Sequence, residues 1–176
     1  MIHNHDKLEP APFLVDNVSL LPRGRALDIA MGNGRNAVYL AQMGFAVEGV
    51  DISSEAVSRT REFARHAGVT IGARVVDLES DFHIPTGAYD AIICFYYLQR
   101  SLIPQIKSGL RAGGGTVVYE TFIVDQAHLG KPQNPAYLLE HNELLDMFRD
   151  LRCLRYREGM IGGSAVAGIV AVREDA

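Results

Sequence analysis

Short, almost wholly apolar runs alternate along this chain with segments whose apolar residues recur at helical spacing. The strand-like runs cover 25–30, 45–50, 71–76, 89–95 and 116–122. The helical segments cover 10–21, 35–43, 53–67 and 101–110. Strands that alternate with helices in this way predict a parallel sheet with helices on both faces.

The C-terminal third departs from this alternation. A long connection over 124–140 contains one glycine and two prolines, and a short helix is expected over 143–149. Connections of this length inside a compact domain are usually functional. Two further strand-like runs, 153–157 and 166–172, are joined through a glycine-rich stretch and predict an antiparallel hairpin. The expected fold is therefore α/β: a doubly wound sheet of about seven strands, mostly parallel, with an antiparallel hairpin at its C-terminal edge.

The composition is that of an ordinary globular domain. The chain has 176 residues, of which 48% are hydrophobic and 22% charged, and its formal net charge is −4. One domain over 1–176 is expected, with an N-terminal arm and helix over 1–24 covering the site. The acidic balance argues against a nucleic-acid partner. No apolar run reaches the roughly 18 residues of a membrane span, and the polar N-terminus is unlike a secretory signal, so the expected location is cytoplasmic.

Metal binding and disulfide bonding are not expected. His3, His5 and Asp6 could be imagined as metal ligands, but they fit better as part of a solvated arm. Cys94 and Cys153 stand in apolar, strand-like runs, and both are interpreted as reduced core residues.

The segment from Arg25 to Leu40 joins the first strand to a helix through a loop of small residues. A glycine turn at a helix N-terminus lets backbone amides approach a ligand closely. Residues 32–37 match the pattern G-x-G-x-x-A, and Asp51 follows about twenty residues later, as in dinucleotide-binding folds. A nicotinamide-dependent oxidoreductase is therefore one candidate.

Three acids favour a different ligand. Asp28, Asp51 and Asp77 end, or nearly end, the first three strands, so they are expected along the carboxyl edge of the sheet, where such folds bind ligands. A carboxylate there would repel a pyrophosphate, but it suits a ligand with a positive centre and hydroxyls. S-Adenosylmethionine offers an ammonium for Asp28, a ribose diol for Asp51 and an adenine amino group for Asp77.

The motifs around these acids resemble those of the class I S-adenosylmethionine-dependent methyltransferases. Leu-Asp-Ile-Ala-Met-Gly-Asn-Gly-Arg-Asn-Ala at 27–37 is similar to motif I, and Val-Glu-Gly-Val-Asp-Ile-Ser at 47–53 to motif II. Val-Val-Asp-Leu-Glu at 75–79, the run at 89–98 and the run at 110–120 resemble the third motif, motif IV and the post-motif segment. Within the superfamily the chain looks most like the tellurite-resistance-type small-molecule methyltransferases.

The resemblance implies a Rossmann-like fold, S-adenosylmethionine as cofactor and S-adenosylhomocysteine as product. It places the methionyl group against the first loop, the ribose at Asp51, and the adenine against the residues that follow the second and third strands. One departure is Ala30, where motif I usually has glycine. Arg35 and Asn36 also fit as residues that simply cap or solvate the first turn of their helix. The expected cofactor-binding residues are Asp28, Ala30, Gly32, Gly34, Arg35, Asn36, Asp51, Ile52, Asp77, Leu78, Cys94 and Phe95.

Methyl transfer from a sulfonium is an in-line displacement, so the enzyme contributes mainly by holding donor and nucleophile in line. An acceptor that is already a thiolate or oxyanion needs no general base, so the catalytic residue stays unknown. Tyr96, Arg100, Glu120 and His128 are candidates for the acceptor side. Tyr96 also fits as core packing, Arg100 as a salt bridge at a helix start, and His128 as an exposed loop residue.

A small-molecule acceptor is expected, an oxyanion such as tellurite, a thiol or a similar nucleophile, because no recognition module for a macromolecule is evident. The protein is expected to be a monomer or a homodimer. Two other functions stay open: the nicotinamide-dependent oxidoreductase, and a module that binds S-adenosylmethionine without catalysis.

Overall fold

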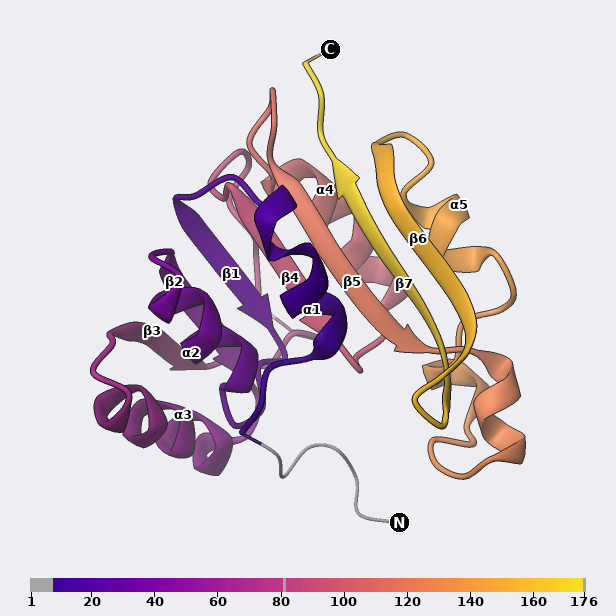
Figure 1. The fold of residues 1–176 in the computed structure, drawn as a ribbon, viewed down its shortest axis with the longest axis horizontal. Helices are drawn as coiled ribbons and strands as arrows, with labels where there is room; N and C mark the ends of the chain where they lie inside the picture. The colour runs from indigo at the N-terminus through magenta and orange to yellow at the C-terminus, as the bar shows by residue number, and fades with distance from the viewer. Residues whose placement is uncertain (1–7, 81, 176) are drawn as a thin grey trace.

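The computed structural model describes residues 8–80 and 82–175. Within these residues seven strands form one sheet in the order β3-β2-β1-β4-β5-β7-β6 (Figure 1). The strands are β1 (Arg25–Ile29), β2 (Ala46–Asp51), β3 (Ile71–Val75), β4 (Ala91–Phe95), β5 (Thr116–Phe122), β6 (Arg152–Ile161) and β7 (Ser164–Val172). The α-helices are α1 (Pro12–Asn17), α2 (Arg35–Gln42), α3 (Ser54–His66), α4 (Ile103–Gly109) and α5 (Glu143–Met147). The expected doubly wound α/β fold is confirmed.

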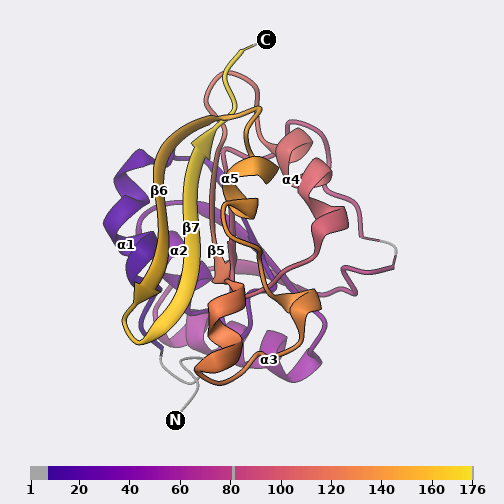
Figure 2. The same cartoon turned by 90° about the vertical axis from the view of Figure 1, so that its right-hand side faces the viewer.

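The first five strands are parallel, and their register brings their carboxyl ends to one edge. β1 lies at the centre, paired with β2 on one side and β4 on the other. All five residues of β4 are buried, as expected for a strand that helices cover on both faces. Helices α1 and α2 cover one face of the sheet, and α4 and α5 cover the other (Figures 1 and 2).

Local signals set most helix boundaries. The Ser53 hydroxyl accepts a hydrogen bond from the Ala56 amide at 3.1 Å and caps α3, as its sequence predicts. Gly44 follows α2 with a φ of +94°, the left-handed conformation that ends many helices. Ser101 does not cap α4, because a 3₁₀ turn (η3, Arg100–Leu102) precedes that helix and no side chain caps it.

The N-terminal segment is tied to the first turn of α2. The Asn36 Oδ1 atom accepts a hydrogen bond from the Ala11 amide at 2.8 Å. Phe13 and Leu14 of α1 are buried against the sheet. The potential metal ligands His3, His5 and Asp6, and most of the expected arm, lie outside the described residues.

The C-terminal strands are longer than their sequence predicts. β6 continues through the glycine-rich stretch that was expected as a connection, and only Gly162 and Gly163 turn the chain, both at positive φ. β7 lies between β5 and β6 and is antiparallel to both, so β6 is the edge strand. The expectation of a core position for Cys153 is wrong, since it stands on this edge strand and is exposed, whereas Cys94 is buried.

The long connection is not structureless. It contains two short 3₁₀ helices, η4 (Val124–His128) and η5 (Pro135–Tyr137). In the part of the chain that the structure describes, no helix has the length and apolar character needed to cross a bilayer.

Candidate functional site

The loop that follows β1 is fixed by the two elements next to it. The Met31 amide donates to the Val50 carbonyl at 3.0 Å, and the Gly32 amide donates to Asp51 Oδ2 at 2.9 Å. From α3, the Thr60 hydroxyl donates to the Gly32 carbonyl at 3.0 Å. Hydrogen bonds from β2 and α3 therefore hold the loop in one conformation.

Three residues of this loop have left-handed backbone conformations, each for a different reason. Ala30 has a φ of +53°, which costs a non-glycine residue about 1–2 kcal/mol, and this explains why glycine is usual at its position in motif I. Gly32 has a φ of +55°, and a Cβ there would have no neighbouring atom within 4 Å. Gly34 has a φ of +79°, and a Cβ there would lie 2.5 Å from the Thr60 methyl carbon. Gly32 thus leaves open space, whereas Gly34 lets α2 approach α3.

A cavity of about 320 Å³ opens beside this loop at the carboxyl ends of β1, β2 and β4. It contains seven of the twelve residues expected at the cofactor. The residues that line it are Asp28, Ala30, Met31, Gly32, Asn33, Arg35, Asn36, Asp51, Phe95, Tyr96 and Tyr97. Met31 and Asn33 were missed by the sequence reasoning, although their place within the loop was a usable signal.

The other five expected residues lie outside the cavity. Ile52 is 68% exposed, and exposed Asp77 accepts the Glu79 amide in a turn at 2.9 Å. Leu78, Gly34 and Cys94 are buried. The three residues expected at the adenine end, Ile52, Asp77 and Leu78, thus lie outside the cavity, and binding there stays a prediction.

Asp28 is the most perturbed acid of the site. Its side chain is buried, and among the described residues its Oδ2 atom has no hydrogen-bond partner. Burial, against the lowering effect of Arg35 and with a smaller contribution from the charge of Asp51, raises the pKa of Asp28 from 3.8 to about 8; the Ala37 amide also lowers it. A carboxylate in this position favours a cationic partner.

Asp51 connects the loop to the second strand. Its Oδ1 atom accepts the Ser53 amide at 2.9 Å, while its Oδ2 atom accepts the Gly32 amide. Because each carboxylate oxygen has two lone pairs, Asp51 retains acceptor capacity toward the cavity that it lines.

A second group of polar residues lies beside the cavity, near the carboxyl ends of β4 and β5 and in the middle of β6. Glu120 is 1% exposed, and Arg157 donates to its Oε2 atom from Nε at 2.9 Å and Nη2 at 2.7 Å. The Tyr96 amide donates to the Glu120 carbonyl at 2.8 Å, and Tyr96 has a φ of +57°, a strained conformation that costs about 1–3 kcal/mol. Sequence reasoning missed Arg157, because the pairing of β6 was unknown.

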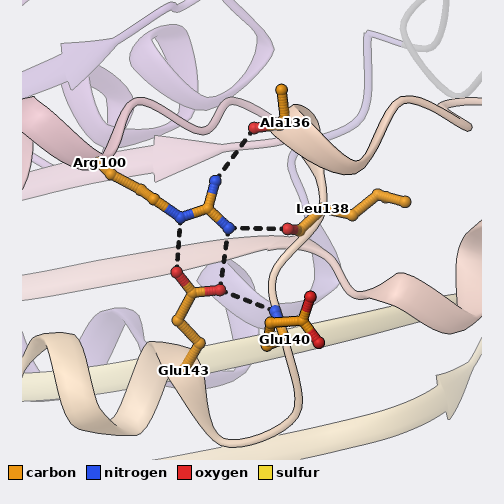
Figure 3. A network of polar contacts seen from close by, with 5 residues as sticks. All are labelled: Arg100, Ala136, Leu138, Glu140 and Glu143. Carbon is orange, nitrogen blue, oxygen red and sulfur yellow. Dashed lines mark hydrogen bonds and ion pairs between the residues drawn. The ribbon is translucent and has the colours of Figure 1, made fainter.

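Arg100 is occupied in holding the long connection (Figure 3). Its Nε and Nη2 atoms donate to the two Glu143 carboxylate oxygens at 2.6 and 2.9 Å, and it also donates to the Ala136 and Leu138 carbonyls at 3.1 and 2.9 Å. Of the two interpretations of Arg100, as an acceptor-side residue or as part of a salt bridge at a helix start, the structure agrees with the salt bridge. His128 is exposed in η4.

Asp90 lies at the opposite, amino end of the sheet, where it accepts the Arg25 amide at 2.8 Å. This contact and an ion pair with Arg111 at 2.7 Å give Asp90 a structural role. Among the residues that the structure describes, no group of three or more His, Cys, Asp or Glu side chains is placed to hold a metal ion.

Known proteins with the same fold match both the sequence and the structure. The chain is 23% identical over 158 residues to the probable S-adenosyl-L-methionine-dependent methyltransferase TehB of Haemophilus influenzae, covering 84% of this chain and 52% of that protein. The crystal structure of TehB from the same organism superposes with a TM-score of 0.77 at 20% identity, covering 91% of this chain and 61% of that one. A methyltransferase structure from Aquifex aeolicus, described as SAM dependent, superposes with a TM-score of 0.69 at 18% identity, covering 94% and 91%.

The chain spans about half the length of the curated relatives it matches. Residues 26–114, just over half of the chain, match the family model described as a methyltransferase domain. This range includes all of β1 except Arg25, the strands β2 to β4 and the whole cavity loop. The chain therefore belongs to the methyltransferase domain family, and it shares the fold of the superposed structures.

Proposed function

We propose that this chain binds S-adenosylmethionine in the cavity beside the first loop and transfers its methyl group to a small-molecule nucleophile. The observation that carries the proposal is the buried Asp28 carboxylate, whose Oδ2 atom has no partner among the described residues although Asp28 lines the cavity. A buried carboxylate without a partner is costly, so this acid holds a proton at neutral pH until a cation binds beside it and lets it ionise.

The residues of the cavity fit this cofactor. Asp28 can accept hydrogen bonds from the methionyl ammonium, and Asp51 has lone pairs left for the ribose hydroxyls. Open space above Gly32 leaves room for the methionyl chain against the loop backbone. A dinucleotide would instead bring its pyrophosphate close to two carboxylates, which disfavours the oxidoreductase alternative.

Bound S-adenosylmethionine supplies an electrophilic methyl group on a sulfonium. The contribution of this chain is to hold that group in a fixed position, because hydrogen bonds from β2 and α3 fix the loop before any ligand arrives. Phe95, Tyr96 and Tyr97 form the wall at the end of β4, where we place the acceptor. Alignment of this kind supplies several kcal/mol toward a displacement.

The acceptor is a small molecule in this proposal, an oxyanion such as tellurite or a thiol. Tyr96 and Glu120 are the acceptor-side residues that we propose. Arg100 is left out, because its donors hold the loop.

Calorimetric titration with S-adenosylhomocysteine tests the cofactor site. We expect micromolar binding by the wild type, weakened about tenfold or more by Asp51→Ala, because hydrogen bonds to a carboxylate contribute about 1.5–3 kcal/mol each. Asp146→Ala is the matched control, since this acid is exposed on α5 and its loss should leave binding unchanged. Thermal denaturation of both variants identifies a loss caused by unfolding. No binding at millimolar ligand would refute the proposal.

Two further outcomes decide between the alternatives. Binding of a reduced nicotinamide cofactor without binding of S-adenosylhomocysteine would favour the oxidoreductase. Binding of S-adenosylhomocysteine without transfer of a tritiated methyl group to tellurite, selenite or any thiol would favour the non-catalytic module.

A further inference from the structure

Two side-chain hydrogen bonds lead from the cavity to the turn that follows β3. Tyr97 lines the cavity, and its hydroxyl donates to Gln99 Oε1 at 2.7 Å. The Gln99 Nε2 atom donates to the Leu78 carbonyl at 3.0 Å and to the Ser101 hydroxyl at 3.2 Å. Because a carbonyl oxygen only accepts hydrogen bonds, the amide nitrogen has to face Leu78 and the amide oxygen has to face Tyr97. Gln99 thus joins the cavity wall to this turn.

The Tyr97 end of this connection is fixed to the core. Tyr119 of β5 is 1% exposed, and its hydroxyl donates to the Tyr97 carbonyl at 2.6 Å. Burial, with a smaller contribution from the charge of Glu79, raises the pKa of Tyr97 to about 12. The Tyr97 hydroxyl therefore keeps its proton at neutral pH and stays a donor to Gln99.

The turn over 77–80 has few other links to the centre of the sheet. Asp77 Oδ1 accepts the Glu79 amide at 2.9 Å, and the Asp77 carbonyl accepts the Ser80 amide at 3.3 Å, so both of these hydrogen bonds stay within the turn. In the sheet, β2 and β1 separate β3 from β4, so strand pairing does not connect the turn to the residues after β4.

The Leu78 side chain is buried in the same apolar cluster as Leu98. Apolar burial is non-directional, so this packing places the Leu78 side chain without setting the angle of its peptide groups. A hydrogen bond is directional. The donation from Gln99 therefore orients the Leu78 backbone relative to the cavity wall.

The edge of adenine presents a donor beside an acceptor, its 6-amino group and its N1 atom. The Asp77 carboxylate retains lone pairs that can accept from the amino group, and the Leu78 amide can donate to N1. Hypoxanthine has an oxygen in place of the amino group and a proton on N1, so it presents the reverse pattern. A turn held at a fixed angle can distinguish the two bases.

We propose that Gln99 is a positioning residue that makes the cofactor site selective for adenine, by holding the Leu78 carbonyl. This inference rests on the proposed methyltransferase function and deepens it by naming what sets the selectivity of that site for the base. Gln99 itself does not contact the cofactor. Its hydrogen bond orients the Leu78 backbone, so that the Leu78 amide and the Asp77 carboxylate meet the edge of adenine together.

The test compares two ligands that differ only at the edge of the base, S-adenosylhomocysteine and S-inosylhomocysteine. We expect calorimetry to show that the wild type binds S-adenosylhomocysteine at least about 30-fold more tightly, because hypoxanthine mismatches both contacts. Gln99→Met keeps the length of the side chain but removes its amide. It should weaken binding of S-adenosylhomocysteine about tenfold and change binding of S-inosylhomocysteine less than about twofold, so the ratio of the two dissociation constants should fall to about threefold.

Gln133→Met is the matched control, since Gln133 is exposed in the long connection, and it should leave both dissociation constants unchanged. Gln99→Glu separates the two hydrogen bonds of the Gln99 amide. The glutamate still accepts from the Tyr97 hydroxyl, but its second oxygen faces the Leu78 carbonyl and cannot donate to it. We expect the same loss of selectivity as in Gln99→Met. Thermal denaturation verifies folding, and Gln99→Glu decides by the same ratio if Gln99→Met does not fold.

Failures of the two proposals are distinguishable. Absence of S-adenosylhomocysteine binding by the wild type refutes the proposed function and this inference with it. Equal binding of the two ligands by the wild type overturns the inference and leaves the function standing. Equal losses for both ligands in the Gln99 variants also overturn it, because they would indicate a merely structural role. Wild-type selectivity in Gln99→Glu would exclude the contact with Leu78 as its cause and overturn the inference too.

Discussion

Replacement of Asp28 by asparagine should stabilise the free protein and weaken cofactor binding. The folded-state pKa of Asp28 is about 8, against 3.8 as its ordinary value. A group whose pKa is raised by folding contributes its full stability below the unfolded value and loses it as the pH rises through the folded value. The affected window for Asp28 therefore runs from about pH 4 to about pH 8.

The magnitude follows from the size of this shift. Each pKa unit corresponds to about 1.4 kcal/mol. Between the unfolded pKa of 3.8 and pH 7, the free energy of unfolding of the wild type therefore falls by on the order of 4 kcal/mol relative to a protein with an uncharged side chain in place of Asp28. An asparagine side chain cannot ionise, so we expect Asp28→Asn to be more stable than the wild type at pH 7 by about 2–4 kcal/mol. The advantage of the variant should shrink toward pH 5.

Urea unfolding at pH 5, 6, 7 and 8 measures this difference, with Asp146→Asn as the exposed control. We expect the free energies of wild type and Asp28→Asn to diverge by about 1 kcal/mol per pH unit, while the control stays parallel to wild type. Parallel curves for Asp28→Asn would refute the assignment of a raised pKa to this buried acid.

Cofactor binding supplies the second half of the test. At pH 7 about nine tenths of Asp28 is protonated in the free protein if its pKa is about 8. If the ligand ammonium binds the carboxylate, calorimetry in buffers of different ionisation enthalpy should show release of about 0.9 proton per S-adenosylhomocysteine bound. Asp28→Asn should release none and bind more weakly. A proton release that persists in the variant would assign the proton to another group.

Two further substitutions test how the loops are held. Ala30→Gly should change the free energy of unfolding by less than about 1 kcal/mol, because relief of the left-handed strain offsets the greater freedom of glycine in the unfolded chain. Ala30→Val should lower the free energy of unfolding, measured with urea, by more than about 2 kcal/mol. Equal effects of the two substitutions would show that φ at this position is not strained. Arg100→Gln should destabilise the protein by about 1–2 kcal/mol, because its contacts to Glu143 and to two backbone carbonyls are lost. Limited proteolysis should then cleave the variant within residues 124–142 faster than the wild type. Cleavage at the wild-type rate would contradict this role of Arg100.

Much of the site could be predicted because the carboxyl ends of parallel strands lie at the same edge of a sheet. Once the alternation of strands and helices implied a parallel sheet, Asp28 and Asp51 had to meet at one edge. The Ser53 cap and the Gly44 turn were also predictable, because helix ends depend on local residues. The loop that these rules identify lines the cavity.

The acceptor side depends on contacts that no local pattern reveals. Glu120 and Arg157 meet only because β7 enters between β5 and β6, which sets their cross-strand register. β6 was too short in the prediction because its charged residues hide the alternation expected of a half-buried strand. The prediction of a core position for Cys153 was wrong because the sequence does not show that its strand lies at the edge of the sheet, where this side chain is exposed.

The order of the last three strands also bears on how the chain folds during synthesis. Among the strands that the structure describes, β6 pairs with β7 alone, and β7 is made after it. Until β7 has left the ribosome, the ten residues of β6 lack the strand with which they pair. Arg157 is then not yet held beside Glu120, because β7 sets the register between β5 and β6. Unpaired strands of this kind are prone to aggregation. The contact between Arg157 and Glu120, and the protection of this segment, therefore both wait for the synthesis of β7.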